Sequence, residues 1–486
     1  MSDLLNKARE FEDTYKKYAD KERPAFHLTG GIGWINDPNG FSLYKEDYHL
    51  FFQYHPFSTH WGPMYWGHVK TKDFIKWERL PIAMAPDSEV DEKGCFSGSA
   101  IELEDGKQLL MYTGVKEVRR SDGILEDIQQ QCIALGDGVD YEKIDRPVLS
   151  AQDLPVGASE IDFRDPKIWK EDGKYYVVIG NRTEDGSGAV LLYESEDALH
   201  WEYRGIIDRS YNVYGKMWEC PDFFELDGKR VLITSPQEMI PIGLEFHAGY
   251  GVMALLGEYD KNNYQFNRES VQSVDYGIDF YAPQTLETKD GRRVMIAWMQ
   301  NWTNIHSQPS GIRLFGSMTC PRELHVENGR LIQNPVKELE AYRTNKVVYK
   351  EVPIQTVTSL EGVSGRIIDL TVTVKGKNYS KFKMHIGQDK DHYVSIRYRK
   401  DKNVIRVDRT RSGGRFDIVH VRDFVIDEKE ELKLRFLIDK YSVELFVNDG
   451  RQAATFMIYS PLSAEGITFE SDEMVRVDVE KYDIEI

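Results

Sequence analysis

The chain has 486 residues, a formal net charge of −18 and 12% aromatic residues. This length favours two domains, and the acidic excess argues against a nucleic-acid ligand, because phosphates attract basic surfaces. No apolar run reaches the roughly 18 residues of a membrane span, and residues 1–23 are too charged to contain the apolar part of a signal peptide. We therefore expect a cytoplasmic protein that binds neither nucleic acid nor membrane.

The cysteine pattern gives no sign of a metal site. Cys95, Cys132, Cys220 and Cys320 are far apart in the sequence and form no Cys-x-x-Cys pair. Such isolated cysteines suit a reducing compartment. We expect neither a metal nor a cofactor.

The N-terminal residues 1–23 are predicted to form a helical extension. Six apolar residues recur at steps of three and four and would share one helix face: Leu4, Leu5, Ala8, Phe11, Tyr15 and Tyr18. After Pro24 the pattern changes to short strands with Asp-Gly turns.

Five segments between residues 24 and 330 then share one layout. Each has a polar start, an apolar strand, a polar turn and a second apolar strand, and in four of them the turn contains Asp-Gly, which favours hairpins. The segments start at Asn36, Phe96, Arg164, Glu219 and Tyr281, with separations of 60, 68, 55 and 62 residues.

The repeats also match where a third strand should turn into a fourth. Residues 71–77 (TKDFIKW) resemble residues 195–201 (SEDALHW). A repeat of this length with four short strands is typical of a propeller blade. We predict a five-bladed β-propeller over residues 24–330, with an unrelated meander or sandwich as the alternative.

The rest of the chain is predicted to form a second domain. Residues 331–345 are interpreted as a linker with a short helical turn, and residues 346–486 alternate apolar and polar side chains at period two, as in Tyr393–Tyr398. Such strands suit a β-sandwich. The predicted fold is all-β: a five-bladed propeller followed by a sandwich, with a short N-terminal helix.

The opening positions of the five repeats locate a candidate active site. The innermost strands of a propeller run in one direction along the central channel, so these positions converge at one end, and three of them carry acids: Asp37, Asp165 and Glu219. Three carboxylates repel one another, and a pair of carboxylates is what glycoside cleavage requires. Each acid alone could instead cap a turn or pair with Arg164. A metal site is the rival chemistry, although these positions supply no histidine.

Neighbouring residues suggest how the acids divide their roles. Close like charges push pKa values apart. Arg164 and the amide of Asn36 are expected to keep the neighbouring aspartates ionised. Glu219 lies between Trp218 and Cys220 in the sequence, so we expect more apolar surroundings and a proton-donor role for it.

Three blocks resemble glycoside hydrolase family 32, the β-fructofuranosidases. They are residues 34–40 (WINDPNG), residues 163–166 (FRDP) and residues 218–221 (WECP). The resemblance implies a propeller followed by a sandwich, and retaining hydrolysis of terminal β-D-fructofuranosides through a covalent fructosyl-enzyme. It implies that Asp37 is the nucleophile, Glu219 the acid/base and Asp165 the transition-state stabiliser. Retention predicts that the carboxyl groups of Asp37 and Glu219 lie about 5–5.5 Å apart.

Further matches to the family imply a fructose pocket. Its residues would be Asn36, Gln53, Trp61, Phe96, Ser97, Arg164, Tyr281 and Trp298. Channel packing is the alternative for Trp61, Phe96 and Trp298, and a bond to backbone is the alternative for Gln53. Cys220 is expected to be a spectator.

The substrate within this class stays open at the sequence level. A cytoplasmic enzyme would meet sucrose, sucrose 6-phosphate or short fructo-oligosaccharides. Lys116, Arg119 and Arg120 are candidates for holding a phosphate, with a solvated charged loop as the alternative. Residues 238–247 are less polar than expected for a family loop beside the leaving-group site, so they do not indicate which leaving group is preferred.

Two other functions use the same residues differently. A fructosyltransferase would keep the three acids and exclude water from the acceptor site. A non-catalytic carbohydrate-binding propeller predicts damaged acids, whereas all three are present. The sandwich is expected to act as a brace or as the surface of a homodimer rather than as a sugar-binding module.

Overall fold

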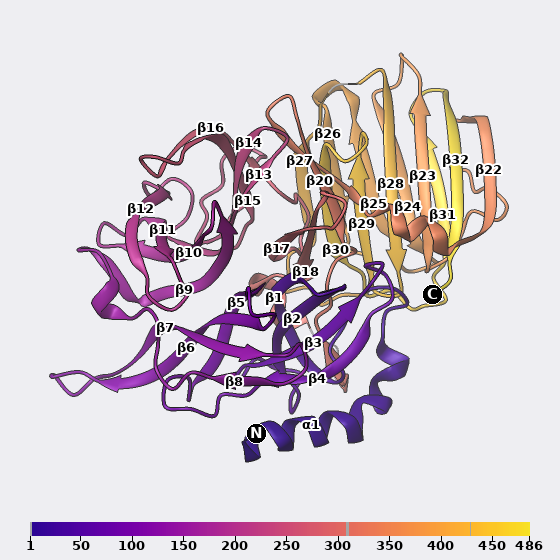
Figure 1. Ribbon diagram of the computed structural model, residues 1–486. Helices are drawn as coiled ribbons and strands as arrows, with labels where there is room; N and C mark the ends of the chain where they lie inside the picture. The colour runs from indigo at the N-terminus through magenta and orange to yellow at the C-terminus, as the bar shows by residue number, and fades with distance from the viewer. Residues whose placement is uncertain (1, 308–310, 428) are drawn as a thin grey trace.

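The computed structural model describes residues 2–307, 311–427 and 429–486. It consists of a propeller, a sandwich beside it and one N-terminal helix at the edge of the propeller (Figure 1). The predicted five-bladed propeller followed by a β-sandwich is confirmed.

The N-terminal helix differs in detail from its prediction. Helix α1 (Asp3–Tyr15) begins at Ser2, whose hydroxyl accepts the N–H of Leu5, and continues as the 3₁₀ helix η1 (Lys16–Glu22). Leu5 is buried as expected, but Tyr15 and Tyr18 are exposed. The change at Lys16 to a tighter helix shifts the period from 3.6 towards 3 residues per turn, which takes Tyr18 off the expected face.

Five separate sheets form the blades, each with its first strand innermost. Blade one contains β1 (Gly33–Tyr44), β2 (Asp47–His55), β3 (Tyr65–Thr71) and β4 (Glu78–Met84); blade two β5 (Gly94–Glu102), β6 (Gln108–Arg119), β7 (Leu125–Gly136) and β8 (Tyr141–Lys143). Blade three contains β9 (Ala158–Glu171), β10 (Lys174–Thr183), β11 (Gly188–Ser195) and β12 (Glu202–Arg209); blade four β13 (Met217–Leu226), β14 (Lys229–Gln237), β15 (Met253–Asp260) and β16 (Gln265–Ser273). Blade five contains β17 (Tyr281–Glu287), β18 (Arg293–Trp298), β20 (Arg322–Glu327) and β21 (Arg330–Pro335).

The ring of blades is closed between the fifth and the first. Strands β1, β5, β9, β13 and β17 pack side by side around the channel. The short strand β19 (Leu314–Phe315), which lies between β18 and β20 in the sequence, pairs in parallel with β1. The N–H of Gly33 donates to the carbonyl of Arg313 at 2.7 Å. Blade five therefore supplies an extra strand to blade one.

The second domain is a sandwich of a six-stranded and a five-stranded sheet. The first has the order β22 (Arg343–Ile354), β32 (Val475–Ile484), β23 (Ile368–Lys375), β28 (Glu431–Asp439), β29 (Ser442–Val447) and β30 (Gln452–Met457). The second has the order β27 (Val421–Val425), β26 (Val404–Asp408), β25 (Val394–Arg399), β24 (Lys381–Gln388) and β31 (Gly466–Ser471). Alternate side chains of both sheets form one apolar core. Short 3₁₀ helices complete the described elements: η2 (Ala151–Asp153), η3 (Trp302–Ser307), η4 (Lys337–Tyr342) and η5 (Lys400–Lys402).

The connection between the domains is shorter than the predicted linker of residues 331–345. Strand β21 extends to Pro335 and is the outermost strand of blade five, and β22 begins at Arg343. Only η4 and its neighbouring residues connect the two sheets. The apolar residues Leu331 and Ile332 belong to the blade, where their side chains are buried.

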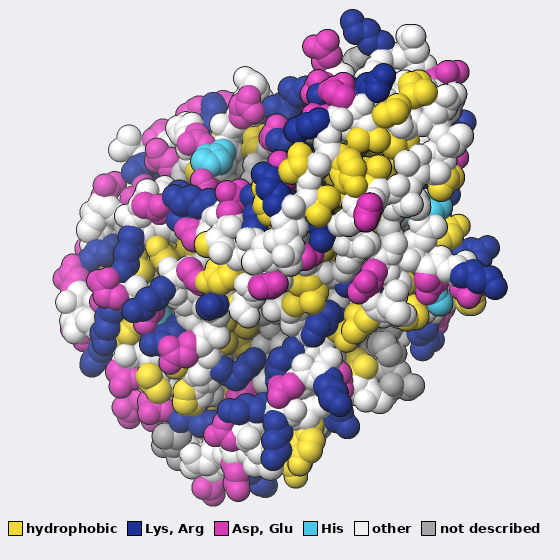
Figure 2. Space-filling view, turned by 90° about the vertical axis from the view of Figure 1, so that its right-hand side faces the viewer, with side chains coloured by type: hydrophobic (Ala, Val, Ile, Leu, Met, Phe, Trp, Pro, Cys, Tyr) yellow, Lys and Arg dark blue, Asp and Glu magenta, His cyan; other side chains and the backbone are white. Residues whose placement is uncertain are grey.

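The surface mixes charges of both signs. On the face in Figure 2, Asp and Glu side chains are interspersed with Lys and Arg, so the net charge of −18 does not create a field of one sign there. In the described ranges, no helix is long and apolar enough to cross a bilayer.

Candidate active site

A β-bulge interrupts each inner strand at the position where the repeats begin. The register to the second strand shifts between Ile35 and Pro38 in blade one and between Glu219 and Asp222 in blade four, and the other three blades shift at the equivalent place. A bulge re-aims side chains and is common beside active sites. The sequence-predicted acids therefore lie together at one end of the channel.

Three of these bulges hold a residue other than glycine in the left-handed region. The φ angles are 66° for Asp165, 48° for Cys220 and 52° for Ala282. Each of these residues precedes a proline. A left-handed conformation costs on the order of 1–3 kcal/mol unless the surroundings impose it. Blades three to five thus share one strained backbone turn at the candidate site.

Asp37 is held by a hydrogen bond to each carboxylate oxygen. The hydroxyl of Ser97 donates to Oδ2 at 2.7 Å and the amide of Asn36 donates to Oδ1 at 3.1 Å. The indole of Trp34 donates to Asn36 at 2.7 Å and fixes that amide. Burial, together with the negative charge of Glu219, raises the pKa of Asp37 to about 6 against the lowering effect of these hydrogen bonds.

Asp165 is joined to the neighbouring blades through its backbone and side chain. Its N–H donates to the hydroxyl of Thr113 and its carboxylate accepts the N–H of Cys220, both at 2.9 Å. Burial raises the pKa of Asp165 to about 7, although the guanidinium of Arg164 opposes this shift. The thiol of Cys220 lies 3.6 Å from the carboxylate of Asp165 and 3.7 Å from that of Asp37, so this side chain lies between two of the acids.

Glu219 lies in polar surroundings, contrary to the sequence-based prediction. Arg164 donates to Oε1 at 3.0 Å, and the hydroxyl of Tyr281 lies 2.6 Å from Oε2. The side chain of Trp218 is buried and its indole donates to the carbonyl of Tyr214 instead. The prediction failed because the side chain of Trp218 points to the opposite face of the strand, and the thiol of Cys220 lies between Asp37 and Asp165.

Arg164 connects the acids to residues that the sequence motifs did not single out. Its guanidinium donates to Asp162 at 2.9 Å and to Gln129 at 3.2 Å, in addition to Glu219. Burial lowers the pKa of Arg164, but the surrounding carboxylates outweigh burial and raise it. Gln129 lies on a third strand, outside the repeated segments, whereas Thr113 and Ser235 lie near the ends of second strands, away from the opening positions that the repeats singled out.

The aromatic side chains predicted to line the fructose pocket differ in how far they are exposed to solvent. Trp61 is 48% exposed and meets the ring of Phe96 edge-on at 6.0 Å. Trp298 is fully buried and packs against Trp34 and Trp302 at 5.8 and 5.1 Å. Trp298 therefore makes the channel-packing contacts of its alternative interpretation, and its role as a wall of the fructose pocket stays a prediction.

Gln53 follows its alternative interpretation. The side chain is buried and its amide donates to the carbonyl of Cys95 at 2.9 Å. This bond fixes the backbone immediately before Phe96 and Ser97. Gln53 thereby supports the residue that donates to Asp37.

No group of three or more His, Cys, Asp or Glu side chains in the described ranges could hold a metal ion. The described acids are instead satisfied by Ser97, Asn36, Arg164, Tyr281 and the backbone of Cys220. This arrangement combines carboxyl groups in distinct settings, which acid–base and nucleophilic chemistry on one substrate requires.

Comparison with known proteins places the chain in a family. The model of the glycosyl hydrolases family 32 N-terminal domain matches residues 27–335, and that of the family 32 C terminal matches residues 338–485. The chain is 36% identical over 470 residues to a sucrose-6-phosphate hydrolase of Zymomonas mobilis, covering 90% of this chain and 86% of the relative. It is 36% identical over 441 residues to a raffinose invertase of Escherichia coli, covering 90% and 89%.

Solved structures agree with this assignment. A family 32 β-fructofuranosidase mutant of Bombyx mori in complex with sucrose is 31% identical and has a TM-score of 0.84, covering 99% of this chain and 98% of that chain. A sucrose-6-phosphate hydrolase of Lactobacillus gasseri is 27% identical and has a TM-score of 0.84, covering 98% and 96%. The chain therefore belongs to glycoside hydrolase family 32, and it is a glycoside hydrolase.

Proposed function

We propose that this enzyme hydrolyses terminal non-reducing β-D-fructofuranosides of the sucrose type, with retention through a covalent fructosyl-enzyme. The observation that carries the proposal is the convergence of Asp37, Asp165 and Glu219 from three blades, each with different partners. The names of the relatives support the substrate class: sucrose-6-phosphate hydrolase, raffinose invertase and a β-fructofuranosidase in complex with sucrose.

Asp37 is the nucleophile in this proposal. Ser97 and Asn36 each donate to one of its oxygens, which fixes the plane of the carboxylate for attack on the anomeric carbon. A covalent intermediate formed and hydrolysed on one face of the sugar retains its configuration. Asp165, whose carboxylate lies beside the thiol of Cys220 as that of Asp37 does, accepts hydrogen bonds from fructose hydroxyls in the transition state.

Glu219 is the general acid and later the general base. The hydroxyl of Tyr281 lies 2.6 Å from Glu219 and 2.9 Å from the carbonyl of Ser235. A carbonyl only accepts, so when Tyr281 donates its single proton to Ser235, a protonated Glu219 can donate to Tyr281. Arg164 in turn stabilises the ionised form. One carboxyl group thus has a partner in each of the two protonation states that the mechanism needs.

The charged residues of blade two favour an uncharged leaving group. Arg120 pairs with Glu126 and Glu160 at 2.7 and 2.6 Å, and Arg119 donates to the carbonyl of Gly123. A phosphate at this hairpin would have to displace the carboxylates of Arg120. Sucrose is accordingly the proposed substrate, and sucrose 6-phosphate is the competing one.

The catalytic roles can be tested by three variants. We expect Asp37→Ala and Glu219→Ala to lower kcat by at least about 10²–10⁴-fold with unchanged circular dichroism. The loss of kcat in Glu219→Ala should be smaller with a fructoside whose leaving group needs no proton. Glu225→Ala, an exposed acid on the same strand β13, is the matched control and should keep its activity. Activity that survives Asp37→Ala would contradict the covalent mechanism.

The stereochemistry and the substrate can be tested with the unmodified enzyme. NMR of the first product formed in the presence of methanol should show methyl β-D-fructofuranoside, whereas the α-anomer would contradict retention. Values of kcat/KM for sucrose, sucrose 6-phosphate, 1-kestose and inulin would rank the leaving groups. A higher value for sucrose 6-phosphate would contradict the proposed preference, and mainly oligosaccharide product at high sucrose would indicate a transferase.

A further inference from the structure

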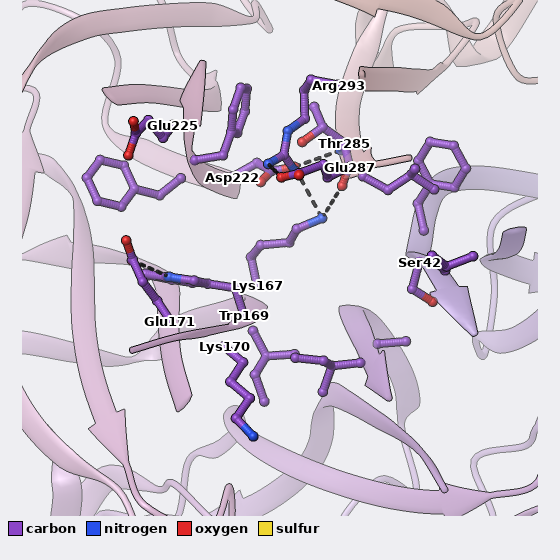
Figure 3. A pocket seen from close by; sticks show the side chains of 18 of the residues that line it. Ser42, Lys167, Trp169, Lys170, Glu171, Asp222, Glu225, Thr285, Glu287 and Arg293 are labelled. Carbon is purple, nitrogen blue, oxygen red and sulfur yellow. Dashed lines mark hydrogen bonds and ion pairs between the residues drawn. The ribbon is translucent and has the colours of Figure 1, made fainter. Parts of the chain in front are cut away.

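The central channel ends, away from the three acids, in a cavity of about 420 Å³. Later residues of the inner strands β1, β5, β9, β13 and β17 line it, and none of the three acids does. Figure 3 shows the side chain of Lys167 extending across this cavity towards Asp222 and Thr285. These three residues come from blades three, four and five.

Lys167, Asp222 and Thr285 form a connected polar group, which we call the blade clasp. The ammonium group of Lys167 donates to the carbonyl of Thr285 at 2.6 Å and lies 3.2 Å from the carboxylate of Asp222. The same carboxylate accepts the N–H of Thr285 at 2.7 Å. Asp222 is 2% and Lys167 9% exposed, so this ion pair is almost completely removed from water.

The blade clasp lies close in sequence to the proposed catalytic residues. Lys167 is two residues after Asp165, Asp222 three after Glu219, and Thr285 four after Tyr281. In the described ranges no strand pairing joins neighbouring inner strands, although β19 from the blade-five segment pairs with β1. The distances between catalytic groups on different blades therefore depend largely on contacts of side chains, beside a few backbone bonds between blades such as that of Cys95 to Met64.

Two other polar links between inner strands are neutral, whereas Arg164 and Glu219 form a charged link between blades three and four. The hydroxyl of Ser99 donates to the carbonyl of Pro166 at 2.6 Å, and the amide of Gln284 donates to the carbonyl of Gly98 at 2.7 Å. The blade clasp is a charged group that joins three blades at once. A buried ion pair is weak evidence for stability, because apolar residues of similar size often stabilise as well or better. Stability alone therefore does not explain why this position holds an ion pair rather than apolar side chains.

We propose that Lys167 and Asp222 are positioning residues for the reaction. By joining β9, β13 and β17, they set the distances between Asp165, Glu219 and Tyr281. The inference rests on the proposed function of the same site. Its physical basis is that a displacement of about 1 Å between reacting groups can lower the rate by about 10²-fold, whereas the fold tolerates such a shift.

The decisive variant removes both charges together. Lys167→Met alone would leave the carboxylate of Asp222 buried without its partner, which is strongly destabilising. In Lys167→Met/Asp222→Asn, both charges of the pair are removed and the Asn oxygen can still accept the N–H of Thr285, while the nearby Arg293 keeps its ion pair with Glu287. Lys170→Met is the matched control, since Lys170 is an exposed lysine on the same strand that pairs with Glu104. Lys167→Arg retains the charge.

We expect the double variant to fold, with near-ultraviolet circular dichroism like that of the unmodified enzyme. Its kcat for sucrose should fall about tenfold to hundredfold, with KM changed less than kcat. The acidic limb of its pH profile should also move, because the charge of Glu219 contributes to the pKa of both Asp37 and Asp165. Merely structural damage would lower the active fraction without moving the profile.

Three results would overturn the inference. They are a folded double variant with unchanged kcat and pH profile, a loss of rate equalled by Lys170→Met, and a Lys167→Arg variant no more active than Lys167→Met. Failure of the proposed function is distinguishable, because the unmodified enzyme would then release no fructose from sucrose in the same assay.

Discussion

At the residue scale, the acids of the site have environments that oppose their ionisation. Burial and mutual repulsion raise the pKa values of Asp37 and Asp165 to about 6 and about 7. A carboxyl group whose native pKa is raised holds its proton longer in the native than in the unfolded state. Their contribution to the free energy of unfolding therefore falls as pH rises from the ordinary carboxyl pKa of 3.8 to the native values of about 6 and about 7. The enzyme keeps these groups at a cost in folding free energy.

Asp165→Asn should accordingly stabilise the protein while it impairs catalysis. The neutral amide has no ionisation penalty, so we expect a gain on the order of 2–4 kcal/mol at pH 8 that disappears near pH 4. Melting temperatures at the two pH values would measure it. Asp105→Asn, at an exposed position, is the control. An equal gain at both pH values would show that repulsion and burial are not the cause.

Tyr281→Phe tests the protonation of Glu219. The change removes the hydroxyl that joins Glu219 to the carbonyl of Ser235 and leaves a buried acceptor unpaired. A loss of about 1–3 kcal/mol in transition-state stabilisation corresponds to a fall in kcat/KM of about fivefold to 150-fold. We also expect the basic limb of the pH profile to move. An unchanged profile would exclude Tyr281 from the proton transfer.

At the element scale, equivalent turns of different blades reuse one set of contacts. Asp73 and Asp197 each accept two backbone N–H groups in the turn between the third and fourth strands. In both turns the next residue, Phe74 or Ala198, has a φ of 63°. The similarity of residues 71–77 and 195–201 therefore reflects the same local hydrogen bonding.

Substituting these two aspartates should reveal the difference between their side-chain partners, which are the hydroxyl of Tyr342 for Asp73 and the exposed imidazole of His200 for Asp197. Asp197→Ala should lower the free energy of unfolding by about 1 kcal/mol through its turn contacts. Asp73→Ala should cost about 1 kcal/mol more, because Asp73 also accepts the hydroxyl of Tyr342 from the connector between the domains. Urea unfolding of both variants measures this. If Asp197→Ala lowered the free energy of unfolding as much as Asp73→Ala or more, the Tyr342 contact would not contribute to stability.

At the scale of the whole molecule, buried charges join the propeller to the sandwich. Arg322 of β20 bonds to Asp275 at 2.9 Å and to Glu444 of β29, and Arg409 pairs with Asp279. His27, ahead of the first blade, lies 2.8 Å from both Asp439 and Glu444 of the sandwich. The interface is thus specified by charge pairing as well as by apolar contact, which fits the expected role of the sandwich as a brace.

His27 should make this interface sensitive to alkaline pH. Burial alone would lower its pKa, but the two carboxylates outweigh burial and raise it to about 9. Because the native pKa exceeds the unfolded one, the stabilisation is complete below about pH 6.5 and is lost as pH rises through about 9. The contribution is on the order of 3 kcal/mol.

The difference in melting temperature between the unmodified enzyme and His27→Gln measures this effect. It should be largest at pH 6.5 and shrink by pH 9.5. Taking differences cancels the titration of other groups that ionise in this range. A difference that stays constant with pH would show that His27 is neutral in the native protein.

The sequence by itself determined the propeller, the sandwich and the three acids. Hairpin turns and alternating strands are local patterns, and their recurrence about every 60 residues placed Asp37, Asp165 and Glu219 at equivalent positions of different blades. The linker was misplaced because Arg330–Pro335 pairs with β20, and an outermost strand has only the short turn before it as a local signal.

Only the tertiary structure decided what surrounds these acids. Arg164 meets Glu219 across 55 residues, Lys167 meets Thr285 across 118, and Trp298 is covered by residues of blade one and by Trp302. Such neighbours come from separate blades brought together by the closure of the ring. Their contacts arise from packing in three dimensions, for which a strand's own sequence period carries no information.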